Sequence, residues 1–409
     1  MKNEKMPAVF GRLRKLLFWT HLVAGMTGAL FIFCLAATGI CIAYETEVIA
    51  LLEKLHEVTP PADAAPLDLE MLLRRVQSAR PRASFSDLTV AADPGAPVAL
   101  SSGKGAALFL DPYTGEVVGE SSGIAEGFFK AMTNFHRSLA LPGGARPVGQ
   151  AITGAACLLC LSLVLTGLYI WIPRRWSPRA VKAAALFNRR LKGKARDWNW
   201  HNATGLWLAP LLLVMTSTGL VLGYGWANDA VFALAGSPPE RHEEKKEGGE
   251  RAGQRGGPGA TGGGGHAPGR EHSVVLSALP VEGLNDLLAR AKAVSPGWRT
   301  IGVRLSERGP LQFRIEDPSG PTHADTRVTL DRTSGAVISR RVFADQSRGA
   351  RWVAWIRDIH TGQAGGWAGA TLAVLTAGGL LLLVWTGFSL TLRRIVRWRK
   401  DSGRTPALS

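Results

Sequence analysis

The sequence lacks charged residues over four long stretches. Residues 16–44, 147–173, 198–228 and 359–392 contain no Asp, Glu, Lys or Arg. Each stretch exceeds the roughly 20 residues that a helix needs to cross a bilayer. Such long uncharged runs exclude a chain that is soluble throughout. They predict an α-helical membrane protein with four transmembrane helices.

Cysteine is also scarce, with 4 residues in 409. All four lie within the first two uncharged stretches, so the long segments between the stretches hold no cysteine that could form a disulfide. No Cys-x-x-Cys-His motif occurs, which argues against covalently attached haem. No Gly-x-Gly-x-x-Gly motif follows a predicted strand, so the sequence indicates no nucleotide-binding unit.

The net charge of +16 would suggest nucleic-acid binding in a soluble protein. However, segments 1–15, 174–197 and 393–409 hold 20 of the 48 Lys and Arg residues and only 3 of the 32 Asp and Glu residues. In a chain that crosses the membrane four times, these segments share one side, and the positive-inside rule predicts that this side is the cytoplasm. We therefore expect both termini in the cytoplasm and no nucleic acid as a partner.

Two segments on the other side of the membrane are predicted to fold as small α+β domains. In 45–146, apolar residues between positions 69 and 76 have helical spacing, and positions 111–115 form a hairpin turn signal. In 229–358 the helix pattern returns at positions 284–291 and the turn signal at 331–335. They follow a tract at 236–272 rich in Gly, Pro and charge, for which we predict a flexible insert.

The spans repeat as well. Five residues of the first span recur in the third at a constant offset without a gap, beginning with His21 and His201. The second and fourth spans each follow a histidine, His136 or His360, and each ends in Thr-Gly and an Arg pair. A twofold repeat of span, outer domain and span is therefore predicted. In chain order the predicted parts are a cytoplasmic N-terminus (1–15), a first span (16–44), a first outer domain with a final helix that carries His136 (45–146), a second span (147–173), a basic cytoplasmic loop (174–197), a third span (198–228), a second outer region with the insert (229–358), a fourth span (359–392) and a cytoplasmic tail (393–409).

This topology pairs the four histidines. His21 and His201 are expected at one depth near the cytoplasm, and His136 and His360 together at the outer surface. Ionisable side chains within membranes are rare and mark functional sites, and two trans-axial imidazoles in a helical bundle suit a b-type haem. Zinc or copper also binds imidazole, but such sites usually recruit acids or thiolates, and the span interiors offer no acids. Histidines that merely pack at the membrane surface are the simpler alternative.

Haem at two levels would need cations for its propionates and space for its macrocycle. The candidate propionate contacts are Arg14 and Arg196 on the inner side and Arg137, Arg146 and Arg357 on the outer side. Glycines that would let a flat macrocycle approach the backbone are Gly25, Gly28, Gly205, Gly362, Gly365 and Gly366.

Several motifs resemble those of a known family. The segments HRSL (136–139), TGLYIWIPRRW (166–176) and HTG (360–362) resemble the PepSY-associated transmembrane proteins, also described as iron-regulated membrane proteins. The segment DPYTGEV (111–117) resembles the hairpin of a PepSY domain. Family members include inner-membrane ferric-siderophore reductases with two b haems. The resemblance implies PepSY-like periplasmic domains and haem iron bound by His21, His136, His201 and His360.

The function implied by this resemblance is transmembrane electron transfer in the bacterial inner membrane. Two haem b groups would carry electrons to a ferric siderophore or another ferric chelate in the periplasm. Because the sequence indicates no nucleotide-binding unit, the electrons would come from a cytoplasmic reductase or from quinol. The alternative is a non-enzymatic PepSY membrane protein that binds or inhibits periplasmic proteases or peptides. Transport of a metal is disfavoured, because the spans lack acids that could line a path.

Overall fold

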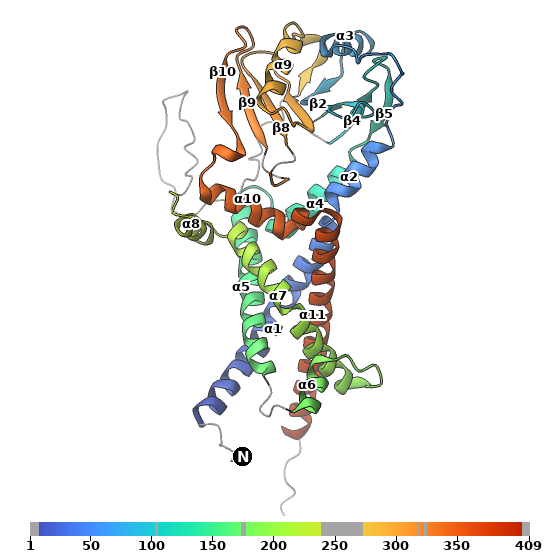
Figure 1. Cartoon of the computed structure of the whole chain (residues 1–409). Helices are drawn as coiled ribbons and strands as arrows, with labels where there is room; N and C mark the ends of the chain where they lie inside the picture. Colours follow the sequence, from blue (N-terminus) through green and yellow to red (C-terminus); the bar gives the residue numbers. More distant parts are fainter. Residues whose placement is uncertain are drawn as a thin grey trace, which may run out of the picture.

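The computed structural model describes residues 8–102, 105–172, 177–238, 273–317, 320–322 and 325–402. Positions 239–272 of the predicted insert lie outside these ranges, as do residues 1–7 and 403–409 of the predicted cytoplasmic termini. The described residues form a bundle of long helices with a β-sheet head at one end (Figure 1).

Four helices are long and apolar enough to cross a membrane. They are α1 (Ala8–Ile42), α5 (Arg146–Trp171), α7 (Gly193–Gly223) and α11 (Gly366–Ser402). In the bundle, α1 packs against α5 and α11, and α7 packs against the same two helices. As a result α1 and α7 lie diagonally opposite each other, as do α5 and α11. The protein is therefore a helical membrane protein, as the uncharged stretches predicted.

Shorter helices flank the long ones at the head end (Figure 1). α2 (Glu45–Lys54) continues from α1 after a short turn, and α8 (Gly225–Leu234) follows α7. α4 (Ile124–Ser138) leads into α5, and α10 (Arg348–Thr361) leads into α11. Short 3-10 turns, Gly143–Ala145 and Gln363–Gly365, join these last two pairs. At the opposite end, α6 (Pro178–Ala185) precedes α7.

The fourth uncharged stretch, 359–392, is not a single helix, contrary to the sequence prediction. α10 ends at Thr361, and Gly362 has a left-handed φ of +81°, which favours glycine. The backbone then turns so tightly that a Cβ at Gly369 would meet the carbonyl of Gly362. The corner between α4 and α5 is equally close, because a Cβ at Gly149 would meet the carbonyl of Ser138. His360 therefore lies on a separate helix before the span, as His136 does.

The head contains one eight-stranded antiparallel sheet in the order β10-β9-β8-β7-β2-β3-β4-β5. Its strands are β2 (Asp87–Ala91), β3 (Val98–Ser101), β4 (Ala107–Leu110), β5 (Val117–Ser121), β7 (Thr300–Arg304), β8 (Leu311–Glu316), β9 (Thr326–Leu330) and β10 (Val337–Arg341). The short strands β1 (Ser84–Phe85) and β6 (Val274–Val275) pair separately.

The sequence predicted two separate α+β domains, but the structure joins them in this one sheet. β2 of the first segment pairs with β7 of the second over five residues, with Thr89 opposite Gly302 at the centre. In isolation, each half would leave one side of β2 or of β7 with unpaired N–H and C=O groups. The pairing of β2 with β7 satisfies the groups of both strands. The two halves thus fold around a shared centre.

Two helices cover one face of the sheet. α3 (Leu69–Ala79) and α9 (Leu284–Val294) bury the apolar residues that the helical spacing predicted, together with alternate strand residues. The helices also contact each other directly, because the backbone N–H of Glu70 and of Asn285 each donate to the other residue's side chain at 3.3 Å. Burial of each large apolar side chain contributes about 1.5–3 kcal/mol, so this continuous core holds both halves together.

Candidate functional site

The structure brings the four predicted histidines together in two pairs at opposite ends of the bundle. The inner pair is His21 on α1 and His201 on α7, with ring centroids 6.3 Å apart and ring planes at 89°. The outer pair is His136 on α4 and His360 on α10, with centroids 6.4 Å apart and planes at 56°. Each pair takes one histidine from each half of the chain.

Every one of these histidines binds a threonine on a neighbouring helix through Nδ1. The four Nδ1 to Oγ1 contacts are His21 with Thr166 (2.9 Å), His136 with Thr38 (2.9 Å), His201 with Thr386 (2.9 Å) and His360 with Thr218 (3.0 Å). In all four cases the threonine comes from the same half of the chain as the histidine. The same histidine–threonine contact between neighbouring helices therefore occurs four times.

These contacts fix the tautomer of each imidazole. Each threonine hydroxyl donates its only proton to the carbonyl four residues earlier in its helix, at 2.6–2.7 Å. Its oxygen is thus left to accept a hydrogen bond from Nδ1. His360 Nδ1 also donates to the carbonyl of Met215 at 3.1 Å, and a carbonyl can only accept. Each neutral ring therefore carries its proton on Nδ1, which leaves the lone pair on Nε2.

A glycine follows each of these threonines and lets the imidazole lie against the helix backbone. A Cβ at Gly167, Gly219 or Gly387 would lie 3.1–3.3 Å from the Cε1 atom of the adjacent histidine, and one at Gly39 would lie at 3.6 Å. Any side chain larger than glycine would push the first three rings away. In each Thr-Gly pair, the threonine thus accepts a hydrogen bond from the imidazole, and the glycine leaves space for the ring beside the helix backbone.

The sequence predicted the four histidines as site residues, but it indicated the Thr-Gly pairs only as part of the twofold repeat. Thr-Gly occurs twice in each of the four uncharged stretches, and the pairs that hold the imidazoles are the later ones, at positions 38, 166, 218 and 386. Of the six glycines that were predicted to face a macrocycle, Gly365 and Gly366 have open space at the Cβ position, and the other four have contacts within the protein. Gly25 packs near Leu163 and Gly205 near Leu383, while Gly362 forms the corner between α10 and α11.

The two arginines predicted for the inner level already have partners within the chain. Arg14 donates to the carbonyls of Ile170 and Ile172 at the end of α5. Arg196 binds the carboxylate of Asp197 at 2.9 Å. Trp200 lies beneath the Arg196 guanidinium, which is 5.6 Å from its ring centroid. Arg196 is therefore ion-paired, whereas Arg14 is bound by carbonyl oxygens and keeps its positive charge.

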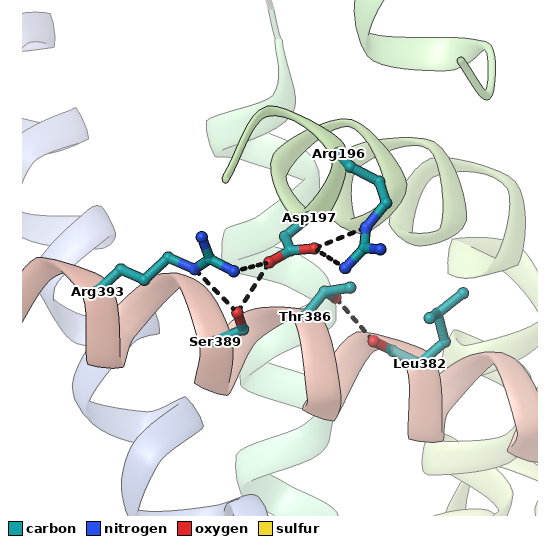
Figure 2. A network of polar contacts seen from close by, with 6 residues as sticks. All are labelled: Arg196, Asp197, Leu382, Thr386, Ser389 and Arg393. Atoms are coloured by element: carbon teal, nitrogen blue, oxygen red, sulfur yellow. Dashed lines mark hydrogen bonds and ion pairs between the residues drawn. The ribbon is translucent and has the colours of Figure 1, made fainter. Parts of the chain in front are cut away.

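Asp197 joins α7 to α11 beside the inner histidine pair. The residue is only 2% exposed, and its carboxylate accepts from Ser389 at 2.8 Å and from Arg393 at 3.2 Å as well as from Arg196. Figure 2 shows this network one helical turn from Thr386, the threonine that holds His201. The single carboxylate of Asp197 neutralises one of its two guanidinium partners, so the three side chains together keep one net positive charge.

The three arginines predicted for the outer level lie near one another. Partial burial lowers the pKa of Arg137, and the positive charges of Arg357 and Arg146 lower it further. Within the part of the chain that the structure describes, none of the three forms an ion pair with a carboxylate. This end of the bundle therefore combines a histidine pair with a concentration of positive charge, which favours an anionic group.

Burial also acts on the outer histidines. It lowers the pKa of His136 to about 4, with further lowering by the neighbouring His360 and Arg137. Burial likewise lowers the pKa of His360. Both imidazoles are consequently neutral near pH 7, and neutral imidazole is the form that binds metal ions.

Comparison with known proteins identifies the family. Residues 18–394 match the model of the PepSY-associated TM region. The chain belongs to the PepSY-associated transmembrane family. This match confirms the resemblance that the sequence motifs indicated, and it identifies the chain as a multi-pass membrane protein. No curated protein matches the chain closely enough to count as a relative.

The donor atoms available in this PepSY-associated protein restrict what its histidine pairs could hold. Across the described ranges, no group of three or more His, Cys, Asp or Glu side chains is arranged to hold a metal ion. Structural and catalytic zinc sites take at least three protein ligands. A metal at either pair would have only two imidazoles from the protein, so any further ligands would be water or the atoms of a cofactor.

Proposed function

We propose that this protein carries two b-type haems and conducts electrons across the membrane to a ferric chelate. The observation that carries the proposal is the spacing of the two histidine pairs. An imidazole nitrogen binds a transition metal at about 2 Å and lies roughly 1 Å from its ring centroid, so two histidines that held one iron ion between them would have centroids roughly 6 Å apart. The observed separations of 6.3 and 6.4 Å fit this arrangement.

The donor set supports haem over a bare metal ion. A porphyrin supplies four nitrogen ligands, so two histidines complete six-coordinate iron, and the tautomer fixed by each threonine leaves Nε2 to bind it. Haem supplies the one-electron redox chemistry when bound. The chain's own residues hold the rings, fix their protons and set the local charge. At the outer level Arg137, Arg146 and Arg357 are the candidates to neutralise propionates.

The two levels lie far apart along the bundle. Helix α1 carries His21 of the inner pair and Thr38, which binds a histidine of the outer pair. Helix α7 carries His201 and Thr218 in the same roles and with the same sequence separation. At a rise of about 1.5 Å per residue, each of these helices climbs about 25 Å between the levels, which is most of the apolar thickness of a bilayer. Two redox centres at these levels would divide the membrane into two electron-transfer steps.

Orientation follows from the charge distribution and the proposed twofold repeat of the chain. The basic segments are assigned to the cytoplasm and the sheet head to the periplasm of a bacterial inner membrane. A cytoplasmic reductase or quinol would deliver electrons to the inner pair. A ferric siderophore or another ferric chelate would accept them beside the outer pair, under the head.

The proposal is tested by reconstituting the purified protein with haem in nanodiscs. We expect a dithionite-reduced spectrum with a b-type α band, and reoxidation of that band when a ferric chelate is added. The double variant His136→Ala and His360→Ala should retain the inner chromophore and lose reoxidation by the chelate. Protein that binds no haem under these conditions would refute the proposal.

The alternative, a peptide-binding PepSY protein, has one structural feature in its favour. The sheet has open edges at β5 and β10, where Val117, Val118, Val337 and Ile338 are 38–57% exposed. An extended peptide could add to such an edge as a further strand. If the two outer histidine substitutions left spectra and chelate reduction unchanged while peptides bound to the head, this alternative would be favoured.

A further inference from the structure

Three arginines stand in a row on the sheet face opposite α3 and α9. Arg314 on β8 is directly opposite Arg327 on β9, and Arg327 is directly opposite Arg341 on β10. Directly opposite residues in antiparallel strands share a face, and their Cβ atoms lie about 5 Å apart. All three residues are exposed. We call Arg314, Arg327 and Arg341 the arginine ladder.

The arginine ladder brings three like charges onto neighbouring strands. Like charges directly opposite on neighbouring strands destabilise the pairing. Asp325 binds Arg314 at 3.1 Å and offsets part of the repulsion. The pKa of Arg327 is lowered by partial burial and by the charges of Arg314 and Arg341, although Asp325 acts in the opposite direction. An anion bound across the row would relieve this repulsion.

The equivalent row in the first half of the sheet has a different composition. Through the register of the strands, Ala99, Phe109 and Gly119 occupy the positions that correspond to the arginine ladder. His56 stacks on Phe109 at 4.5 Å, and a Cβ at Gly119 would collide with the same imidazole. The side chain of His56 therefore covers this row in the first half of the sheet, whereas the arginines in the second half remain exposed.

The loop that precedes β9 links the half of the sheet that carries the ladder to the helix that carries His360. The backbone N–H of Thr322, between β8 and β9, donates to the carboxylate of Asp358 on α10, two residues before His360. Arg327 follows Thr322 by five residues, so their Cα atoms are at most about 18 Å apart. On the same face, Glu316 of β8 interacts electrostatically with Glu53 at the end of α2, which continues from the first span. This face is therefore turned toward the bundle (Figure 1).

We propose that the arginine ladder is the docking site for a polyanionic chelate with several carboxylate groups. Guanidinium groups bind carboxylates through two parallel hydrogen bonds, and three of them in register suit a ligand with several such groups. This inference rests on the proposed function in one respect: the chelate would be the ferric substrate, held beside the outer redox site. It assigns the substrate class as anionic, not neutral or cationic.

Binding is measured with gallium(III) citrate, which is anionic and cannot be reduced under these conditions. The full chain in nanodiscs is used both with and without haem, so the result does not depend on whether haem binds. The test variant is the triple substitution Arg314→Gln, Arg327→Gln and Arg341→Gln. The matched control is Arg340→Gln, because Arg340 is exposed on the same strand but lies opposite Val328, on the other face of the sheet.

We expect the triple variant to bind gallium citrate at least about tenfold more weakly, since it loses several charge-assisted hydrogen bonds. The Arg340→Gln protein should bind as the parent does. A gallium chelate of a cationic hydroxamate should bind the parent weakly and gain affinity for the triple variant. Equal loss in the control, or equal binding of both chelates by the parent, would overturn the proposal.

A second readout separates ligand binding from a structural role. If the arginines serve only to hold the sheet, their removal should lower the thermal unfolding temperature of the ligand-free protein. If they are kept for an anion, removal of the like-charge contacts should raise it. Lysine at all three positions should keep the preference for the anionic chelate but bind it more weakly than the parent, because an ammonium group lacks the bidentate geometry. A lower unfolding temperature with unchanged citrate binding would contradict the assignment.

Discussion

The inner and outer histidine pairs have the same local construction and different electrostatic surroundings. Both use Thr-Gly pairs to hold the imidazole rings. At the inner pair, Asp197 binds Arg196 and Arg393 and limits the net charge. At the outer pair, three arginines cluster, and no described carboxylate pairs with them. Positive charge stabilises the electron-rich state of a nearby redox centre, so the different charges around the two pairs should give the two sites different reduction potentials.

Removal of one histidine from each pair should have the largest effect. His21→Ala should abolish haem binding at the inner level only, and His136→Ala at the outer level only. Each variant should therefore fall from two haems per chain to one, with the remaining potential different in the two cases. Pyridine haemochrome analysis with redox titration measures this. Equal remaining potentials in both variants would remove the proposed difference between the levels.

The outer pair should also make haem-free protein sensitive to acid. The pKa of His136 is about 4 in the folded protein and near 6.5 when unfolded, so the unfolded chain binds more protons between these values. The contribution of neutral His136 to the free energy of unfolding is therefore fully present above pH 6.5. It is lost as the pH falls toward 4, by up to about 1.4 kcal/mol per pH unit. Denaturant titrations across this range should show a shallower pH slope for His136→Gln. An unchanged slope would contradict this interpretation.

The next largest effect concerns the charge at the inner level. Asp197→Asn should reduce the free energy of unfolding by about 1–2 kcal/mol, because two partly exposed guanidinium groups lose their carboxylate. The added positive charge should raise the inner potential and leave the outer potential unchanged. Asp229→Asn, on α8, is the matched control and should change neither quantity. An unchanged or lower inner potential in Asp197→Asn would contradict the proposed role of this carboxylate.

Substitution of single threonines should have the smallest effect. Thr386→Val keeps the shape of the side chain and removes one acceptor from His201 Nδ1. The imidazole becomes a weaker donor to iron, and the inner potential should rise by a few tens of millivolts, since one hydrogen bond is worth about 1 kcal/mol. Thr38→Val should act in the same way on the outer potential alone. A response of both potentials to one substitution would indicate that the four units are not independent.

Much of the fold could be predicted from the sequence, because charge and apolar runs determine where helices cross a membrane. The pairing of His21 with His201 and of His136 with His360 followed from topology alone. The break at Gly362 could not be predicted from charge, because the stretch remains uncharged on both sides of it. The corner depends on a left-handed glycine and a close backbone contact, which composition does not reveal.

Other features depend on contacts between distant parts of the chain. The pairing of β2 with β7 joins segments that lie on either side of two membrane spans in the sequence, so two domains were expected where one sheet forms. The Thr-Gly pairs were visible as a repeated motif, but their role depends on which helix faces which histidine. The arginine ladder exists only through strand register, which places Arg327 between two other arginines.

The central claim is that two histidine pairs hold two haems at separate levels. The most direct test is the haem-to-protein ratio of the purified full chain, combined with low-temperature electron paramagnetic resonance of the oxidised form. We predict a ratio of two and low-spin signals typical of bis-histidine ligation, with one signal lost in His21→Ala and another in His136→Ala. A ratio of zero, or two haems that persist in both variants, would contradict the claim.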